Sequence, residues 1–126
     1  MLKLFRAALL LVSLLAGTAF AAPTGFDQAT FDALQKEGNS TLVMIHADWC
    51  QTCKAQAPIL AELLGSSEYK SLHALRVDFD QQKDAVRNFK ATMQSTLIVF
   101  KGGKEVGRST DETKKDSIAA LLKKAF

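Results

Sequence analysis

An unbroken apolar run followed at once by a pair of cysteines constrains the fold of this chain more than any other feature. Residues 41–47 read Thr-Leu-Val-Met-Ile-His-Ala, a segment of strand length that is rich in apolar and β-branched side chains. Such a run is typical of a strand that is buried on both faces of a sheet. Cys50 and Cys53 follow within a few residues, and a helical pattern then continues to about Gly65. The sequence therefore predicts a central strand that leads through the cysteines into a helix.

The rest of the chain alternates between helical and strand patterns. Apolar spacing predicts helices over 26–38, 81–90 and 111–125, and strands over 72–80, 96–100 and 105–109. The adjacent Gly102 and Gly103 predict a tight hairpin turn between the last two strands. Alternation that ends in a hairpin predicts an α/β fold, in which a mixed central sheet of about four strands has helices on both faces. We expect a single domain over residues 22–126.

The first 21 residues differ in character from the rest of the chain. A short basic start with Lys3 and Arg6 precedes an apolar run from Ala7 to Ala16, and Ala19-Phe20-Ala21 offers small residues where a signal peptidase cleaves. The apolar run is shorter than the roughly 20 residues that a membrane-spanning helix needs. We therefore expect residues 1–21 to be a signal peptide. The mature protein is then periplasmic or secreted, with no membrane attachment after cleavage.

The charge balance does not indicate a nucleic-acid partner. The chain contains 16 Lys and Arg against 13 Asp and Glu, a net charge of +3. Lys3 and Arg6 leave with the predicted signal peptide, so the mature chain has 14 against 13 and a net charge of +1. The remaining basic residues are scattered and form no stripe of the kind that binds nucleic acid. We expect a monomer without a nucleic-acid partner.

The spacing of the two cysteines predicts a reactive pair and not a disulfide that stabilises the fold. A structural disulfide stabilises most when it closes a long loop, whereas a bridge between Cys50 and Cys53 closes a very short one. Residues three apart on a helix share a face, so the two sulfurs can come within bonding distance. Cys50 falls at the helix start, where the helix dipole favours an anion, and the thiolate is the attacking species. We predict that Cys50 attacks a substrate disulfide and that Cys53 resolves the mixed disulfide, with no cofactor beyond the redox-active Cys50–Cys53 disulfide.

This arrangement resembles the thioredoxin superfamily over nearly the whole mature chain. The block Ala47-Asp48-Trp49-Cys50-Gln51-Thr52-Cys53-Lys54 is similar to the family's active-site sequence, and Pro58 stands where the family has a proline that kinks the active-site helix. Val77–Asp80 resembles the family's next strand, and Leu97–Gly103 resembles its hairpin. The resemblance implies a thioredoxin-like fold and thiol–disulfide exchange on protein or small-molecule disulfides.

The resemblance also implies a substrate-facing surface, made here by Trp49, Ser95 and Thr96. Ser95 stands where the family usually has a cis-proline that faces the active site and shields the thiols from metals. The chain also lacks, near Asp111, a glycine that is common after the hairpin. We therefore expect substrate docking to depart from the family pattern and a metal site to be more accessible here than in its relatives.

The residues that serve proton transfer in the family are replaced as well. Met44 stands where many thioredoxins have a buried acid under the second cysteine, and Arg76 stands where the lysine partner of that acid is often found. The usual proton acceptor for Cys53 is therefore missing. Three interpretations of His46, four residues before Cys50, stay open: it handles the Cys53 proton, it joins the two thiolates as a metal ligand, or it is a packed core residue.

Two classes of function are compatible with the cysteine pair. The first is a disulfide reductase or electron carrier outside the cytoplasm, supplied by an unidentified electron donor. We favour this direction because Gln51-Thr52, between the cysteines, contains no histidine that would stabilise the reduced form. The alternative is a module in which Cys50, Cys53 and His46 bind Cu(I) or Zn(II). A binding domain without catalysis is a third hypothesis, and the intact cysteine pair counts against it.

Overall fold

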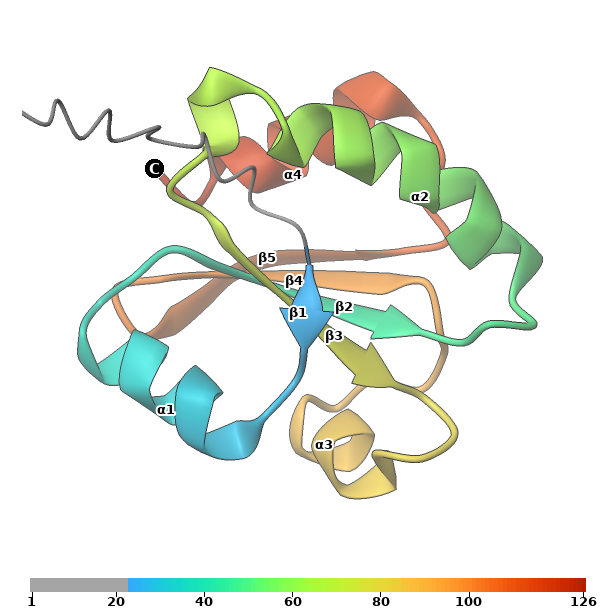
Figure 1. The fold of residues 1–126 in the computed structure, drawn as a ribbon, viewed down its shortest axis with the longest axis horizontal. Helices are drawn as coiled ribbons and strands as arrows, with labels where there is room; N and C mark the ends of the chain where they lie inside the picture. Colours follow the sequence, from blue (N-terminus) through green and yellow to red (C-terminus); the bar gives the residue numbers. More distant parts are fainter. Residues whose placement is uncertain (1–22) are drawn as a thin grey trace, which may run out of the picture.

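A computed structural model describes residues 23–126, and the predicted signal peptide lies outside these residues. The described chain consists of five strands, four α-helices and one 3-10 turn (Figure 1). In chain order they are β1 Thr24–Gly25, α1 Gln28–Lys36, β2 Thr41–His46, α2 Gln51–Leu64, η1 Ser67–Tyr69, β3 His73–Asp78, α3 Lys83–Asn88, β4 Thr96–Lys101, β5 Lys104–Thr110 and α4 Lys115–Lys123. No helix within residues 23–126 is both long enough and apolar enough to cross a membrane.

The five strands form one mixed sheet in the order β1-β3-β2-β4-β5. β1, β3 and β2 run parallel, whereas β4 is antiparallel to β2, and β5 is antiparallel to β4. β2 is thus a central strand, as its apolar run predicts. The hairpin between β4 and β5 is confirmed, because Gly102 and Gly103 have φ angles of 58° and 79°, which a tight turn of this kind requires.

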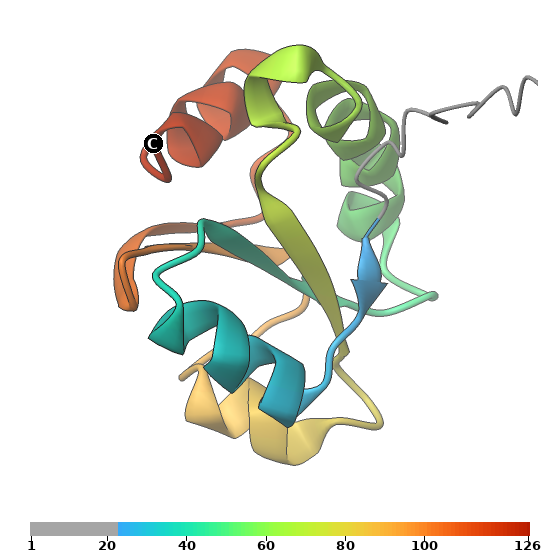
Figure 2. The ribbon, with the colours of Figure 1, turned by 60° about the vertical axis from the view of Figure 1, so that its left-hand side comes forward.

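Two helical layers cover the sheet, with α2 and α4 on one face and α1 and α3 on the other (Figures 1 and 2). Alternate side chains of β2 enter the two layers: Leu42 and Met44 pack with α2 and α4, and Val43 and Ile45 pack with the opposite core. Successive side chains of a strand point to opposite faces, so a strand covered on both sides is apolar at every position. This explains the unbroken apolar run. The second core includes a cluster of four aromatic rings: Phe26, Phe31, Phe89 and Phe100.

The thioredoxin-like α/β fold is confirmed, with three differences from the predicted elements. The sheet has five strands and not four, because the two-residue β1 pairs with β3 and is too short to show a period in the sequence. The last helix begins at Lys115 and not at Asp111, since Asp111 has a φ of 60° that a helix cannot accommodate. Apolar spacing predicts Ala57, Leu60, Ala61 and Leu64 as the buried stripe of α2, whereas the structure buries Leu60, Leu64 and the polar Gln56 and leaves Ala57 and Ala61 exposed. Pro58 lies on the exposed side of α2, which is one unbroken helix.

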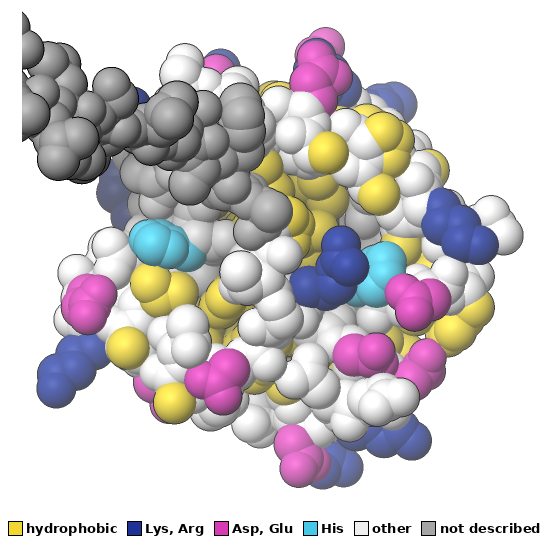
Figure 3. All heavy atoms as spheres, viewed as in Figure 1, with side chains coloured by type: hydrophobic (Ala, Val, Ile, Leu, Met, Phe, Trp, Pro, Cys, Tyr) yellow, Lys and Arg dark blue, Asp and Glu magenta, His cyan; other side chains and the backbone are white. Residues whose placement is uncertain are grey.

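The surface visible in Figure 3 mixes acidic and basic side chains without an extended basic area on that face. The exposed large apolar side chains within residues 23–126 are Trp49, Met93 and Phe126. Trp49 directly precedes the cysteine pair, so an exposed apolar side chain lies beside the cysteines. Exposed apolar side chains of this size are common in binding surfaces.

Candidate active site

The cysteine pair lies where the central strand gives way to a helix. β2 ends at His46, and a turn follows in which the Cys50 N–H donates to the Ala47 carbonyl at 3.1 Å. Cys50 has extended backbone angles and is the N-cap of α2, and its Sγ accepts a hydrogen bond from the Cys53 N–H at 3.1 Å. A thiolate accepts such a bond more strongly than a thiol does. The fold thus directs a free helix N–H at the Cys50 sulfur, as the sequence predicts.

Both cysteines are unpaired and nearly inaccessible. Cys50 is 2% exposed and Cys53 is 4% exposed, and they pack with Ala47 against Phe79. Burial is the main cause that raises the pKa of Cys53 to about 11, and the hydrogen bond with Cys50 raises it further. The backbone amides of Ala47 and Ser95 act in the opposite direction. Cys53 is therefore a protonated thiol at neutral pH.

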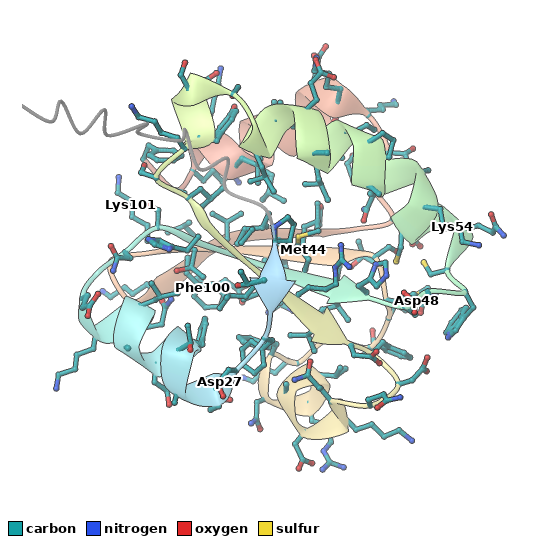
Figure 4. All side chains as sticks on the ribbon, viewed as in Figure 1. Asp27, Met44, Asp48, Lys54, Phe100 and Lys101 are labelled. Carbon is teal, nitrogen blue, oxygen red and sulfur yellow. The ribbon has the colours of Figure 1, made fainter. Side chains whose placement is uncertain are left out.

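A cavity of about 250 Å³ lies behind Cys53, between β2, β3 and α2. Met44 and Arg76 are direct partners in the pairing of β2 with β3, and both line this cavity. Figure 4 shows Met44 beneath α2 near the centre of the molecule, with Asp48 and Lys54 at the end where α2 begins. The cavity wall is mainly apolar, and within residues 23–126 Arg76 forms no ion pair. Among the residues that the structure describes, no carboxylate side chain lines the cavity beside Cys53.

His46 lines the same cavity as Cys53. Its Nε2 lies 3.0 Å from an Asp48 carboxylate oxygen, and its side chain is 20% exposed. The predicted metal set of Cys50, Cys53 and His46 is not brought together, because no three His, Cys, Asp or Glu side chains within residues 23–126 are grouped closely enough to hold an ion. The structure thus places His46 near Cys53 and gives no support to a three-ligand site.

Trp49 is the exposed member of the site. Its side chain is 57% exposed although it directly precedes Cys50, and its indole N–H donates to the Asp80 carboxylate at 2.7 Å. This hydrogen bond joins the cysteine loop to the segment after β3. A large, oriented aromatic side chain beside a reactive sulfur suits contact with a substrate.

Ser95 and Thr96 lie at the start of β4 beside Ile45 of β2, and both side chains are buried. Ser95 is 1% exposed and Thr96 is 2% exposed. The Thr96 hydroxyl donates to the Met93 carbonyl at 2.9 Å and lies 3.0 Å from the Thr110 hydroxyl. No peptide bond within residues 23–126 is cis, and Ser95 has a φ of 57° in place of the proline geometry. Their substrate-facing role stays a prediction, and it is limited to the backbone of this segment.

One residue near Cys53, Gln56, was missed in the sequence, and the hydrogen bond of a second, Asp111, was not predicted. Gln56 is 3% exposed, and its amide donates to the Ser95 carbonyl at 3.3 Å and to the Glu112 carbonyl at 2.8 Å. Asp111 accepts a hydrogen bond from the Ser95 hydroxyl. A polar side chain on the Cys53 face of the helix, one turn after it, was the available signal for Gln56. The missing glycine marked the region of Asp111 in the sequence, but no pattern indicated the hydrogen bond between Asp111 and Ser95.

Comparisons with known proteins agree with this geometry. The thioredoxin family model matches residues 23–124. A thioredoxin of Chlamydia muridarum is 37% identical over 83 residues, which cover 66% of this chain and 79% of that protein. A thioredoxin of Staphylococcus aureus is 34% identical over 96 residues, which cover 76% of this chain and 90% of that protein. The crystal structure of Trxlp from Edwardsiella tarda is similar with a TM-score of 0.76 and 37% identity, covering 78% of this chain and 95% of that one.

The fold and the site together define a class of redox protein: a dithiol at the start of a helix, on a mixed sheet between two helical layers. Within that class, the match to the thioredoxin family model and the sequence identities to the two thioredoxins show the family of this chain. The chain belongs to the thioredoxin family. It is a thiol–disulfide oxidoreductase and acts on disulfide substrates.

Proposed function

We propose that the protein is a disulfide reductase or electron carrier that works outside the cytoplasm, with Cys50 as the attacking thiolate and Cys53 as the resolving thiol. The observation that supports this division most strongly is the contrast between the two sulfurs. Cys50 receives a hydrogen bond from the Cys53 N–H at the start of α2, whereas Cys53 lies one turn further along the helix and lines the cavity beneath it. Burial raises the pKa of Cys53 to about 11.

The reaction takes place in two exchanges. The Cys50 thiolate attacks one sulfur of the substrate disulfide, so a Cys50–substrate bond forms, the substrate S–S bond breaks and one substrate thiolate leaves. Cys53 then loses its proton and attacks the Cys50 sulfur, which releases the second substrate thiolate. The substrate gains two electrons and two protons, and the enzyme is left with a Cys50–Cys53 disulfide. An upstream dithiol donor must return two electrons to this disulfide before the next turnover.

The proposed direction, towards reduction of the substrate, follows from what stabilises the dithiol. A strong oxidant of this type owes its potential to a stabilised reduced form. Here Cys53 is held as an ordinary protonated thiol by burial, and Gln51-Thr52 supplies no cationic group to the cysteines. The reduced pair thus gains little extra stability from the protein, which favours donation of electrons.

His46 is the proposed acceptor of the Cys53 proton. It lines the cavity that contains the Cys53 side chain, and the cavity wall includes no carboxylate. The contact of His46 Nε2 with Asp48 orients the ring, because a carboxylate partner fixes which ring nitrogen is free.

The redox state of the pair in the cell tests the proposed direction. Cells are trapped with acid, the thiols are alkylated with a reagent of high mass, and a gel shift reports the fraction of Cys50–Cys53 that is reduced. We expect a mainly reduced pair in the fraction outside the cytoplasm. A mainly oxidised pair would contradict the reductase, and recovery of the protein only from the cytoplasmic fraction would contradict the location. A metal assay on the same sample separates free thiols from thiols that are held by an ion.

A further inference from the structure

The cavity beside Cys53 has the features of a small-molecule site. Its volume is about 250 Å³, and apolar side chains make up most of its wall, Met44, Ile45 and Leu60 among them. Ligand cavities in proteins are lined in the same way and typically start at about 300 Å³. The cavity therefore suits a molecule at the small end of that range, with an apolar body.

Small side chains on α2 leave this cavity open. Ala57 and Ala61 lie one and two turns after Cys53, so the three side chains share a face of the helix, and all three line the cavity. Both alanines are exposed. The cavity is therefore open to solvent along α2, and a single large side chain at Ala57 would fill it.

One cation in the cavity wall has no acidic partner. Arg76 lines the cavity from β3, and within residues 23–126 it forms no ion pair, whereas Arg87 and Arg108 each pair with a carboxylate. Figure 3 shows apolar side chains gathered beneath α2, with a basic side chain beside a histidine at their edge. A guanidinium group is always charged and matches a carboxylate in shape. The charge of the wall therefore favours an anion.

We propose that this cavity binds a small monocarboxylate with an apolar body, with the carboxylate at Arg76 and the apolar part against α2 beside Cys53. A neutral molecule would leave the guanidinium without a partner, and a second carboxylate would meet the apolar wall. Because Cys53 is part of that wall, a bound molecule covers the side of the thiol that faces the cavity. Binding is noncovalent and does not depend on the direction of disulfide exchange.

The test is calorimetric titration of the purified, reduced protein with phenylacetate. We expect a dissociation constant of about 1 mM or lower. Two matched probes separate the two parts of the proposed ligand. Phenylacetamide keeps the apolar ring and removes the charge, whereas acetate keeps the charge and removes the ring. Each should bind at least about tenfold more weakly, since each lacks one of the two contacts. No binding of phenylacetate at 10 mM (about ten times the expected constant), or equal binding of either probe, would overturn the proposal.

Three variants locate the binding. Arg76→Met removes the charge and keeps an unbranched side chain, and Ala57→Phe fills the cavity without a change of charge. Both positions are exposed, so the core should stay intact, and urea unfolding checks this. Each variant should weaken binding at least about tenfold. Arg87→Met is the control, because Arg87 lies on α3 across the sheet, and it should bind as the wild type does. Equal binding in Arg76→Met and Arg87→Met would contradict the proposed site.

Protection of Cys53 gives a second readout that does not depend on turnover. In a Cys50→Ser protein, Cys53 is the single thiol, and its alkylation by iodoacetamide is followed at pH 9. Phenylacetate at about ten times its dissociation constant occupies about nine-tenths of the sites, so the rate should fall at least about threefold. Binding without protection would place the ligand away from Cys53 and overturn the proposal. Neither failure would affect disulfide reduction by the wild-type protein.

Discussion

Ser95 and Asp111 are bound to each other by a side-chain and a backbone hydrogen bond, and both have φ angles near +60°. By the resemblance to the family, Ser95 stands at the place of a cis-proline, and Asp111 lies near the place of a missing glycine. The two residues stabilise each other in an uncommon backbone conformation. This conformation predicts how the segment responds when Ser95 is replaced by proline.

Ser95→Pro should destabilise the protein by about 3 kcal/mol or more. Proline fixes φ near −65° and has no N–H, so it can neither adopt the φ of 57° nor donate to the Ile45 carbonyl. Ser95→Gly is the control, because glycine accepts the positive φ, and we expect a change within about 1 kcal/mol after the loss of the hydroxyl. Urea unfolding of the reduced proteins measures both. A proline variant as stable as the glycine variant would show that the backbone of this segment is not fixed in the way described.

The buried Cys53 thiol predicts a loss of stability at alkaline pH. Its pKa is raised from 9.0 to about 11 in the folded protein, mainly by burial. Between these two values the unfolded chain has lost the proton while the folded chain retains it. The free energy of unfolding therefore falls as the pH rises through this window and is unaffected below it. We expect a contribution on the order of 1 kcal/mol, allowing for screening by nearby water.

The measurement is urea unfolding of the reduced protein at pH 8, 9, 10 and 11. The Cys53→Ser variant is unfolded in parallel and its pH dependence is subtracted, so that only the contribution of the Cys53 thiol remains. A difference between the two proteins that does not change across the window would exclude a raised pKa for Cys53.

The single tryptophan should report the redox state of the pair. Trp49 is the only tryptophan in the chain, directly precedes Cys50 and is 57% exposed. A disulfide quenches the fluorescence of a neighbouring indole, so the emission should rise when Cys50–Cys53 is reduced. Asp80→Ala removes the hydrogen bond that orients the indole and should make this change smaller. Equal emission from the oxidised and reduced wild-type protein would place Trp49 away from the sulfurs.

His46→Ala should slow the resolving step if His46 takes the Cys53 proton. General base catalysis of this kind contributes at least about a hundredfold in many enzymes, and we expect a fall of about tenfold or more in turnover at pH 7, since water can partly replace the imidazole. Turnover is measured as thiol released from a small disulfide under excess donor. His73, the other histidine, is exposed at the start of β3, so His73→Ala is the control. Equal turnover in the two variants would assign His46 a packing role only.

The sequence predicted strands and helices correctly where burial repeats apolar side chains at a regular spacing. The apolar run of residues 41–47 indicated a strand covered on both faces, and the helix start after it located Cys50 and Cys53 correctly. β1 was missed because two residues show no period, and its pairing depends on β3 alone. Gln56 was missed because a buried polar residue has no pattern of its own; its partners, the Ser95 and Glu112 carbonyls, lie 39 and 56 residues away. The left-handed backbone at Ser95 and Asp111 follows from tertiary hydrogen bonds and not from residue type.

The central claim, that Cys50 attacks and Cys53 resolves, is tested most directly by trapping the mixed disulfide. The reduced Cys53→Ser and Cys50→Ser proteins are mixed with a peptide disulfide, quenched with acid, and examined by intact mass and peptide mapping. The geometry predicts that Cys53→Ser accumulates an adduct of one half of the substrate on Cys50, since nothing remains to release it. Cys50→Ser should form little adduct, because a pKa of about 11 keeps Cys53 protonated at neutral pH. Rapid adduct formation on Cys53, with none on Cys50, would contradict the account.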